Sequence, residues 1–321
     1  MRTASIYQPI EAEILQVEES LKAVYKLDFP PLARIVEHVL KQKGKRIRPA
    51  LALLTAKLYK YDSDSLIPMA TGVELLHTAT LVHDDTIDDS FVRRGIPTVN
   101  SLWNGSTAVL VGDYLFAKAA ELVSTTGNVR VIRLFAQALM TICNGELSQS
   151  FNTYNWRQTR QHYYARIGSK TAALFSLATE SGAVLSQAPE PAVQAAKSYG
   201  NNLGMAFQIV DDVLDFTGEE EELGKPVGND LLHGVLTLPT ILFIEKHPED
   251  NTLESIFGDK DKRQNLTRAI ELICDSPAIE DSYKIADEFC ALARQTLEDL
   301  PPNESCRSLV DLTHYVVERK K

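Results

Sequence analysis

Two clusters of aspartates in this sequence share one spacing. The first, DDTIDD, begins at residue 84, and the second, DDVLD, begins at residue 211. Helical residues four apart lie on one face, so each DDxxD pattern stacks its first and last carboxylates. These like charges repel unless a cation lies between them, and hard carboxylate oxygens suit Mg²⁺. The spacing therefore predicts magnesium binding by Asp84, Asp85, Asp88, Asp211, Asp212 and Asp215.

A solvated acidic helix end is the simpler explanation for either cluster alone. Both clusters, however, follow an apolar helical segment, and negative charge at the C-terminal end of a helix opposes the helix dipole. The same local rule is thus broken twice with the same spacing. This repetition favours a shared function over surface charge.

His77 lies seven residues before the first cluster. Seven helical steps come within about 20° of two full turns, so His77 shares the stripe of Asp84. A lone histidine in an apolar helix is more often a core residue. Its alignment with the aspartates favours a place in the site.

Basic residues gather near these clusters. Lys41, Lys43, Lys45, Arg46 and Arg48 lie within eight residues, Arg93 and Arg94 follow the first aspartate cluster, and Lys225 follows the second. A solvated basic patch would explain the first group alone. Arginine, however, suits bidentate recognition of phosphate, and lysine neutralises it as a point charge. The group therefore favours an anionic ligand.

We expect these acidic and basic residues to be positioned by helices. Helical periodicity runs through nearly the whole chain, without the sustained alternation of a half-buried strand. Several central helices are apolar around most of their circumference, which is typical of a large bundle. Two polar segments, 91–104 and 218–232, predict long loops that close over a site. The sequence thus predicts an all-α fold with helices over 10–26, 31–42, 48–60, 66–89, 106–123, 129–151, 157–186, 190–216, 236–247, 262–274, 278–300 and 305–319.

Composition narrows the class of protein. The 321 residues are 44% hydrophobic and 24% charged, and no linker divides them, so we expect a single domain over 1–321. A net charge of −10 argues against nucleic acid as a partner. Four widely spaced cysteines indicate reduced thiols in the cytoplasm. Neither a basic leader followed by an apolar run nor about 18 uninterrupted apolar residues occurs, so we expect no transmembrane segment.

Together these features predict a particular ligand. Magnesium carboxylates and separate phosphate-binding cations, inside an apolar helical shell, would hold a diphosphate at the mouth of an apolar cavity. A prenyl diphosphate has this chemistry. Neither a G-x-x-x-x-G-K-[ST] loop nor a G-x-G-x-x-G turn is present, which disfavours nucleotides.

At this point the sequence closely resembles the trans-polyprenyl diphosphate synthases. The matching motifs cover nearly the whole chain in one order: GKRIRP from Gly44, HTATLVHDDTIDD from His77, RRG from Arg93, GDYLFAKA from Gly112, GSKTAALF from Gly168, MAFQIVDDVLDF from Met205, GKP from Gly224 and ND at 229–230. The resemblance implies the isoprenoid synthase type I fold, a single-domain bundle of long helices around a central cavity. It also implies a homodimer, with the two aspartate motifs facing each other across the cavity mouth.

The resemblance assigns roles to matching residues. The six aspartates would bind Mg²⁺, three ions per site with substrate present. Isopentenyl diphosphate would contact Lys45, Arg48, His77 and Arg94. The allylic diphosphate, or the cation formed from it, would contact Arg93, Lys170, Thr171, Gln208 and Lys225. Many relatives carry a lysine where this chain has Val235, so one diphosphate contact is expected to differ.

Residues one turn before the first motif bear on product length. Ala79 and Thr80 occupy positions where short-chain relatives tend to carry an aromatic residue. Small side chains there leave a path beside the helix. We therefore expect repeated 1'-4 addition of isopentenyl diphosphate to give an all-trans product of C30 to C50. Geranylgeranyl or farnesyl diphosphate remains the alternative.

The sequence leaves two other classes of protein as alternatives. A class I terpene cyclase also ionises a prenyl diphosphate, but its second metal motif normally differs from DDxxD. A noncatalytic subunit of a heteromeric synthase would typically lack some of these aspartates or cations. Peripheral membrane contact is also open, because a long prenyl product is barely soluble in water.

Overall fold

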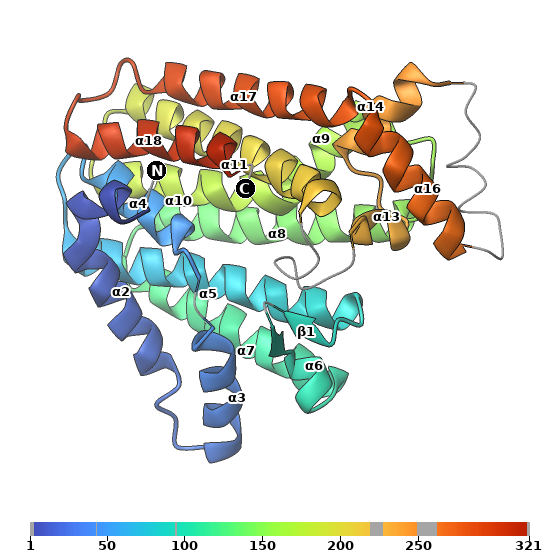
Figure 1. The fold of residues 1–321 in the computed structure, drawn as a ribbon. Coiled ribbons are helices and arrows are strands. Elements are labelled where there is room, and N and C mark those ends of the chain that lie inside the picture. The colour runs from blue at the N-terminus through green and yellow to red at the C-terminus, as the bar shows by residue number, and fades with distance from the viewer. Residues whose placement is uncertain (1–2, 43, 94, 219–226, 249–261, 320–321) are drawn as a thin grey trace. The chain divides into compact units, whose positions relative to one another are not determined.

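The computed structural model describes residues 3–42, 44–93, 95–218, 227–248 and 262–319. Arg94 and Lys225, both expected to contact diphosphate, lie outside these residues. The elements, labelled in Figure 1, are α1 (Thr3–Ile6), η1 (Gln8–Ile10), α2 (Glu11–Val24), α3 (Pro30–Leu40), α4 (Ile47–Ala56), α5 (Ser63–Ile87), β1 (Val92–Arg93), β2 (Ile96–Pro97), α6 (Val99–Leu102), α7 (Gly105–Ser124), α8 (Val129–Asn152), α9 (Arg160–Ile167), η2 (Gly168–Ala172), α10 (Ala173–Leu185), α11 (Glu190–Thr217), α13 (Asn229–Leu232), α14 (Leu238–Lys246), α16 (Lys262–Asp275), α17 (Ala278–Thr296) and α18 (Glu304–Glu318).

The predicted all-α class is confirmed. Within the described ranges, β-structure is confined to a small antiparallel hairpin that pairs Val92 with Pro97 and Arg93 with Ile96. Gly95 lies in its turn with φ +74°, a left-handed conformation that glycine adopts without strain. The segment 91–104, expected to be a loop, thus contains this hairpin and α6.

One predicted helix is interrupted. The periodicity over 157–186 indicated a continuous helix, whereas the structure has α9, a π-helical turn at η2, and α10. The π-helical turn spans five residues, too few to be detected by periodicity over a window of about 11–18 residues. Lys170 and Thr171 both lie in η2.

The chain divides into two compact units. The first contains Met1–Ala138, Leu174–Gly200 and Thr296–Leu312, and the second contains Leu139–Ala173, Asn201–Gln295 and Thr313–Lys321. Helices α8, α11, α17 and α18 contribute residues to both units. The expected single domain over 1–321 stays a prediction.

In the first unit, α5 is the central helix. It packs against α2, α4 and α7, and α7 lies beside it in Figure 1. The close packing depends on Gly72, because a Cβ there would lie 3.2 Å from the Ala119 carbonyl oxygen and 2.8 Å from a Val123 methyl carbon. This packing fixes the helix that carries His77 and the first aspartate cluster.

Helix α5 is also long and apolar enough, by length and composition, to cross a membrane. Its most apolar 18-residue window is 61% buried within the protein, however. The helix also carries Glu74, which is buried. Such burial is typical of the core helix of a bundle, so its apolar composition is explained by packing.

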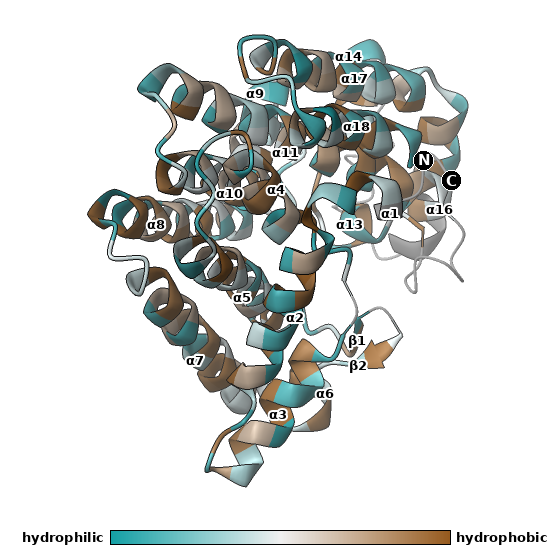
Figure 2. Ribbon diagram, turned by 90° about the vertical axis from the view of Figure 1, so that its left-hand side faces the viewer, coloured by the Kyte–Doolittle hydropathy of each residue, from teal (hydrophilic) through white to brown (hydrophobic). Residues whose placement is uncertain are grey.

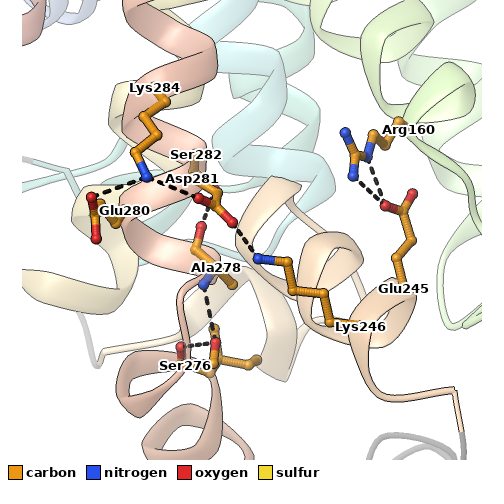
Figure 3. A network of polar contacts seen from close by, with 10 residues as sticks. Arg160, Glu245, Lys246, Ser276, Ala278, Glu280, Asp281, Ser282 and Lys284 are labelled. Atoms are coloured by element: carbon orange, nitrogen blue, oxygen red, sulfur yellow. Dashed lines mark hydrogen bonds and ion pairs between the residues drawn. The ribbon is translucent and has the colours of Figure 1, made fainter.

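In the second unit, polar contacts connect α9, α14 and α17. Figure 3 shows Arg160 of α9 beside Glu245 of α14, with Nε and Oε2 2.7 Å apart. Lys246 of α14 pairs with Asp281 of α17, which also pairs with Lys284. Exposed pairs of this kind contribute little stability individually. Helix α9, which the Arg160–Glu245 pair joins to α14, leads directly into η2.

Candidate active site

The first aspartate cluster lies at the C-terminal end of α5. Asp88 is the residue that ends the helix, and its backbone N–H donates to the carbonyl of Asp84 at 2.8 Å. Asp84 is half-buried and Asp88 is exposed. Asp85 is buried, and its Oδ1 accepts a hydrogen bond from Arg93 Nε at 2.7 Å. The hairpin therefore brings a guanidinium onto the motif.

The pKa of Asp85 is raised overall, although two effects on it oppose each other. Burial raises the pKa of Asp85, and the negative charge of Asp88 raises it further. The positive charge and hydrogen bond of Arg93 oppose both. Arg93, expected to contact the allylic diphosphate, thus neutralises an aspartate of the motif in this structure.

Three residues expected at the isopentenyl diphosphate site belong to the first unit. Lys45 is exposed, just before α4 begins at Ile47. Arg48 is half-buried, with its guanidinium carbon 5.0 Å from the centroid of the Phe175 ring. His77 is half-buried on α5, and its carbonyl accepts a hydrogen bond from Thr80 Oγ1 at 2.7 Å.

A chain of hydrogen bonds connects the second cluster to η2. Thr171 Oγ1 donates to Gln208 Oε1 at 2.6 Å, and Gln208 Nε2 donates to Asp212 Oδ1 at 2.7 Å. The other oxygen of Asp212 accepts from Tyr163 Oη, also at 2.7 Å. The π-helical turn and α11 are thereby joined through side chains, and the amide of Gln208 is held in one orientation.

Asp212 is buried, and its ionisation is perturbed. Burial, and next the negative charge of Asp230, raises the pKa of Asp212 to about 7. The hydrogen bonds from Gln208 and Tyr163 and the charge of Arg166 oppose this rise. Burial and the neighbouring carboxylate also raise the pKa of Tyr163, which therefore keeps its proton as a donor.

The two remaining aspartates of the second cluster contact different partners. Arg319, just beyond α18, donates from Nη2 to Asp211 Oδ1 at 2.5 Å. Its guanidinium also lies 4.3 Å from the centroid of the Phe207 ring. Asp215 is buried, and its Oδ2 accepts from the backbone N–H of Asp230 at 3.1 Å. These contacts connect the motif to the C-terminal residues and to α13.

Lys170 pairs with a carboxylate outside both motifs. Its Nζ lies 2.8 Å and 3.0 Å from the two carboxylate oxygens of Glu146 on α8. Gly145 allows η2 to approach α8, because a Cβ there would lie 2.7 Å from the Cβ of Ser169. The ammonium group is therefore held at a defined place but is already neutralised.

The aspartates of the two motifs suit a divalent metal ion whose other ligands come from water and substrate. Within the part of the chain that the structure describes, no group of three or more His, Cys, Asp or Glu side chains is arranged to hold an ion alone. Mg²⁺ usually binds one or two protein carboxylates and takes its other oxygens from water and substrate phosphate. Paired carboxylates suit this chemistry. Metal binding would, however, compete with Arg93 on Asp85 and with Arg319 on Asp211.

Sequence reasoning missed Glu146, Tyr163 and Arg319. Glu146 is 24 residues from Lys170, and Arg319 is 108 residues from Asp211, so no local spacing relates them. Tyr163 is 49 residues from Asp212, so local spacing does not relate this pair either. The expected contribution of Lys225 lies outside the described residues.

Comparisons with known proteins identify the family to which this chain belongs. The polyprenyl synthetase family profile matches residues 29–273. Component 2 of heptaprenyl diphosphate synthase from Geobacillus stearothermophilus is 37% identical over 319 residues, which are 99% of each chain. The structure of a decaprenyl diphosphate synthase from Rhodobacter capsulatus has a TM-score of 0.93 and 37% identity over 100% of both chains.

A further solved structure is a polyprenyl synthase from Caulobacter crescentus CB15, complexed with calcium and isoprenyl diphosphate. It has a TM-score of 0.93 and 33% identity, covering 100% of this chain and 98% of the other. The present chain belongs to the polyprenyl synthetase family. It has the isoprenoid synthase type I fold and is an enzyme of the prenyltransferase class. Membership decides against the terpene cyclase alternative.

Proposed function

We propose that this enzyme is a long-chain trans-polyprenyl diphosphate synthase. It adds isopentenyl diphosphate repeatedly to an allylic diphosphate, in Mg²⁺-dependent 1'-4 steps, to give products of C30 to C50. The observation that carries the proposal is the pair of DDxxD motifs at the C-terminal ends of two buried helices, α5 and α11. Each motif includes a buried carboxylate held by hydrogen bonds, Asp85 in one and Asp212 in the other.

The proposed roles follow the sequence expectations. The six aspartates would hold Mg²⁺, three ions when substrate is bound, and the bound ions would supply positive charge to the departing diphosphate. Lys45, Arg48, His77 and Arg94 would bind isopentenyl diphosphate. Arg93, Lys170, Thr171, Gln208 and Lys225 would contact the allylic diphosphate or stabilise the cation.

Gln208 illustrates how these residues would work. Thr171 and Asp212 hold its amide in one orientation, so its dipole needs no rearrangement when positive charge develops on the allylic carbon. The double bond of isopentenyl diphosphate then forms the new carbon–carbon bond, and the adduct loses a proton to the released diphosphate. Exclusion of water prevents quenching of the cation.

The expected chain length is supported by side-chain size on α5 and by relatives. Ala79 is completely buried and Thr80 is half-buried, so Thr80 is the small residue with accessible surface on the stripe of Asp84. The heptaprenyl and decaprenyl names of two similar proteins also favour a long product. A C15 or C20 product is the alternative.

The assembly is proposed to be a homodimer. Helix α8 carries exposed apolar residues along its length, Val129 at 70%, Met140 at 59%, Leu147 at 59% and Phe151 at 87% exposure. Their spacings of 11, 7 and 4 residues place them on one stripe. Figure 2 shows much of α8 in brown, the colour of apolar residues. A large exposed apolar stripe favours association.

The name of the Geobacillus relative, component 2, favours a second possibility. A different polypeptide, rather than a second copy, would then cover the stripe and be required for turnover. Retention of both aspartate motifs argues that this chain would be the catalytic member of such a pair.

The enzyme is further proposed to act in the cytoplasm, with peripheral membrane contact for product release. The sulfhydryls support a reducing compartment, because Cys143, Cys274, Cys290 and Cys306 are all free thiols.

The test is incubation of the purified chain with isopentenyl diphosphate, farnesyl diphosphate and Mg²⁺, followed by chain-length analysis of dephosphorylated products. We expect products of C30 or longer. Products that stop at C20 would support the proposed reaction but contradict the proposed chain length. Elongation only after addition of another polypeptide would replace the homodimer with a heteromeric enzyme, and diphosphate release with a cyclic hydrocarbon would overturn the proposed function.

A further inference from the structure

The segment between α3 and α4 contains an unusual backbone conformation. Arg46, immediately before α4, has φ +50° and ψ +34°, in the left-handed region that residues with a Cβ rarely adopt. It lies between Lys45 and Arg48, two of the proposed ligands of isopentenyl diphosphate. Such a conformation persists only where surrounding contacts impose it.

The surrounding contacts are two ion pairs on different helices. Arg46 Nε lies 2.6 Å from Glu18 Oε1 of α2, and Arg46 Nη1 lies 2.7 Å from Glu74 Oε1 of α5. The side chains of Arg46 and Glu74 are only 11% and 7% exposed. The guanidinium is thus directed into the protein and occupied by two carboxylates, which removes it from direct contact with a diphosphate.

A third contact holds the same segment. Tyr7 Oη donates to the carbonyl oxygen of Lys45 at 2.6 Å. Residues 45 and 46 are therefore attached to the N-terminal segment, to α2 and to α5. All of these residues belong to the first unit, so the arrangement does not depend on the second.

One of these partners also relates the segment to His77. Glu74 lies three residues before His77, close to its side of α5. The Arg46–Glu74 pair therefore connects the backbone that carries Lys45 and Arg48 to the helix that carries His77. These are the three described residues assigned to one diphosphate.

We propose that Arg46, Glu18 and Glu74 form a positioning clamp for the isopentenyl diphosphate site. The inference rests on the proposed function. Arg46 does not bind the substrate; its ion pairs impose the left-handed backbone that presents Lys45 and Arg48 at a fixed place relative to His77. Loss of the clamp should therefore weaken binding of isopentenyl diphosphate selectively, since a mobile ligand set must be ordered when substrate binds.

The test compares steady-state kinetics of the intact enzyme, with each substrate varied in turn. For Arg46→Gln and Glu74→Gln, we expect the KM for isopentenyl diphosphate to rise about tenfold, with the KM for the allylic substrate changed less than about twofold. Arg46→Lys should recover only part of the loss, because lysine lacks the fork that contacts two carboxylates. Titration calorimetry with isopentenyl diphosphate should show the same weakening.

A matched control separates positioning from stability. Glu180 of α10 is also buried and lies 3.3 Å from Lys197 and 3.7 Å from Arg130, in the same unit but with no proposed substrate role. Glu180→Gln should lower the melting temperature without a selective change in KM. Since removal of a buried partner can prevent folding, Glu18→Gln is the milder clamp variant, because the Glu18 side chain is 35% exposed.

Lys45→Ala and Arg48→Ala distinguish the possible failures. If they raise the KM for isopentenyl diphosphate while clamp variants behave like Glu180→Gln, the clamp is overturned and the proposed site stands. If Lys45→Ala and Arg48→Ala leave this KM unchanged, the proposed site is wrong and the clamp inference is overturned with it. A selective rise in the clamp variants and in these two supports the proposal.

Discussion

At the residue scale, the aspartates of the two clusters have different hydrogen-bond and ion-pair partners. Asp85 and Asp211 each contact an arginine, whereas Asp212 accepts hydrogen bonds from Tyr163 and Gln208. Buried carboxylates need such donors, because burial without them is costly. These four contacts hold the three carboxylates in defined positions in the structure.

The clearest residue-scale prediction concerns the first aspartate of each motif. Asp84→Ala and Asp211→Ala should reduce turnover by about a hundredfold or more, because each removes a proposed metal ligand. Circular dichroism and the melting temperature should change little, since both side chains are partly exposed. Asp287→Ala, which removes a 61% exposed carboxylate on α17, is the control. Turnover near wild type for either motif variant would contradict the metal assignment.

The raised pKa of Asp212 predicts a pH dependence of stability. In metal-free protein, the unfolded carboxyl ionises near its ordinary pKa of 3.8, whereas the folded one keeps its proton until about pH 7. The stability that Asp212 contributes is therefore complete below pH 3.8 and is lost as the pH rises toward 7. The loss should be on the order of a few kcal/mol.

Urea denaturation in the presence of a chelator would measure this effect, with Asp212→Asn as the reference. The free energy of unfolding of the wild type, relative to this variant, should decline between about pH 4 and pH 7. A relative stability that rises over this window would show that hydrogen bonding, rather than burial, dominates at Asp212.

At the element scale, α5 performs two tasks with different faces. One face packs into the first unit through residues such as Met69 and Leu76, and the stripe of His77 and Asp84 is only half-buried. The π-helical turn η2 does comparable work in the second unit, since it carries both Lys170 and Thr171. In each unit, a packed helix sets the position of polar side chains.

Substitutions on α5 test the expected path of the growing chain. Thr80→Phe should shorten the product, because Thr80 has accessible surface and lies one turn before Asp84. Ala79→Phe should also shorten it if the path follows this helix, but Ala79 is completely buried, so overpacking should cost about 1–3 kcal/mol of stability. Chain-length analysis and melting temperatures measure the two effects. An unchanged product from Thr80→Phe would place the growing chain elsewhere.

The C-terminal end of α18 supplies another prediction. Arg319 places positive charge on Asp211, so a metal ion must compete with it there. Arg319→Gln should lower the Mg²⁺ concentration for half-maximal activity by roughly threefold to tenfold, and should tighten Mn²⁺ binding to the substrate-free protein equally. Arg307→Gln, at an exposed arginine within α18, is the control. Weaker metal binding in Arg319→Gln would instead show that this arginine orients Asp211.

At the scale of the whole molecule, the exposed apolar stripe of α8 requires explanation. Removal of large apolar side chains from water is favourable, so an exposed apolar stripe of this kind is typical of a surface that binds another protein. A second copy of the chain is the proposed neighbour. A different polypeptide is the alternative neighbour.

Charge placed on this stripe should disrupt association. Leu147→Asp should shift the protein from dimer to monomer in analytical ultracentrifugation at micromolar concentration, because an interface charge would be buried without a partner. Leu292→Asp, at a residue of α17 that is 48% exposed, is the control. A wild-type chain that sediments as a monomer would contradict the homodimer and direct attention to a heteromeric partner.

The helices and the aspartate motifs could be predicted from local sequence patterns. Hydrophobic periodicity and the residues that begin and end helices located most described helices to within a few residues, because both signals are local. The DDxxD spacing placed Asp84 above Asp88 without any tertiary information. The interruption at η2 escaped this reasoning, because periodicity is judged over windows much longer than its five residues.

The pairing of charged side chains depends instead on how the chain packs in three dimensions. Asp211 and Arg319 are 108 residues apart, Asp212 and Tyr163 are 49 apart, and Arg46 and Glu74 are 28 apart. Each pairing depends on how helices pack, and spacing along one helix carries no information about a side chain on another. The motifs could therefore be predicted from residue types, whereas the donors and cations that hold them could not.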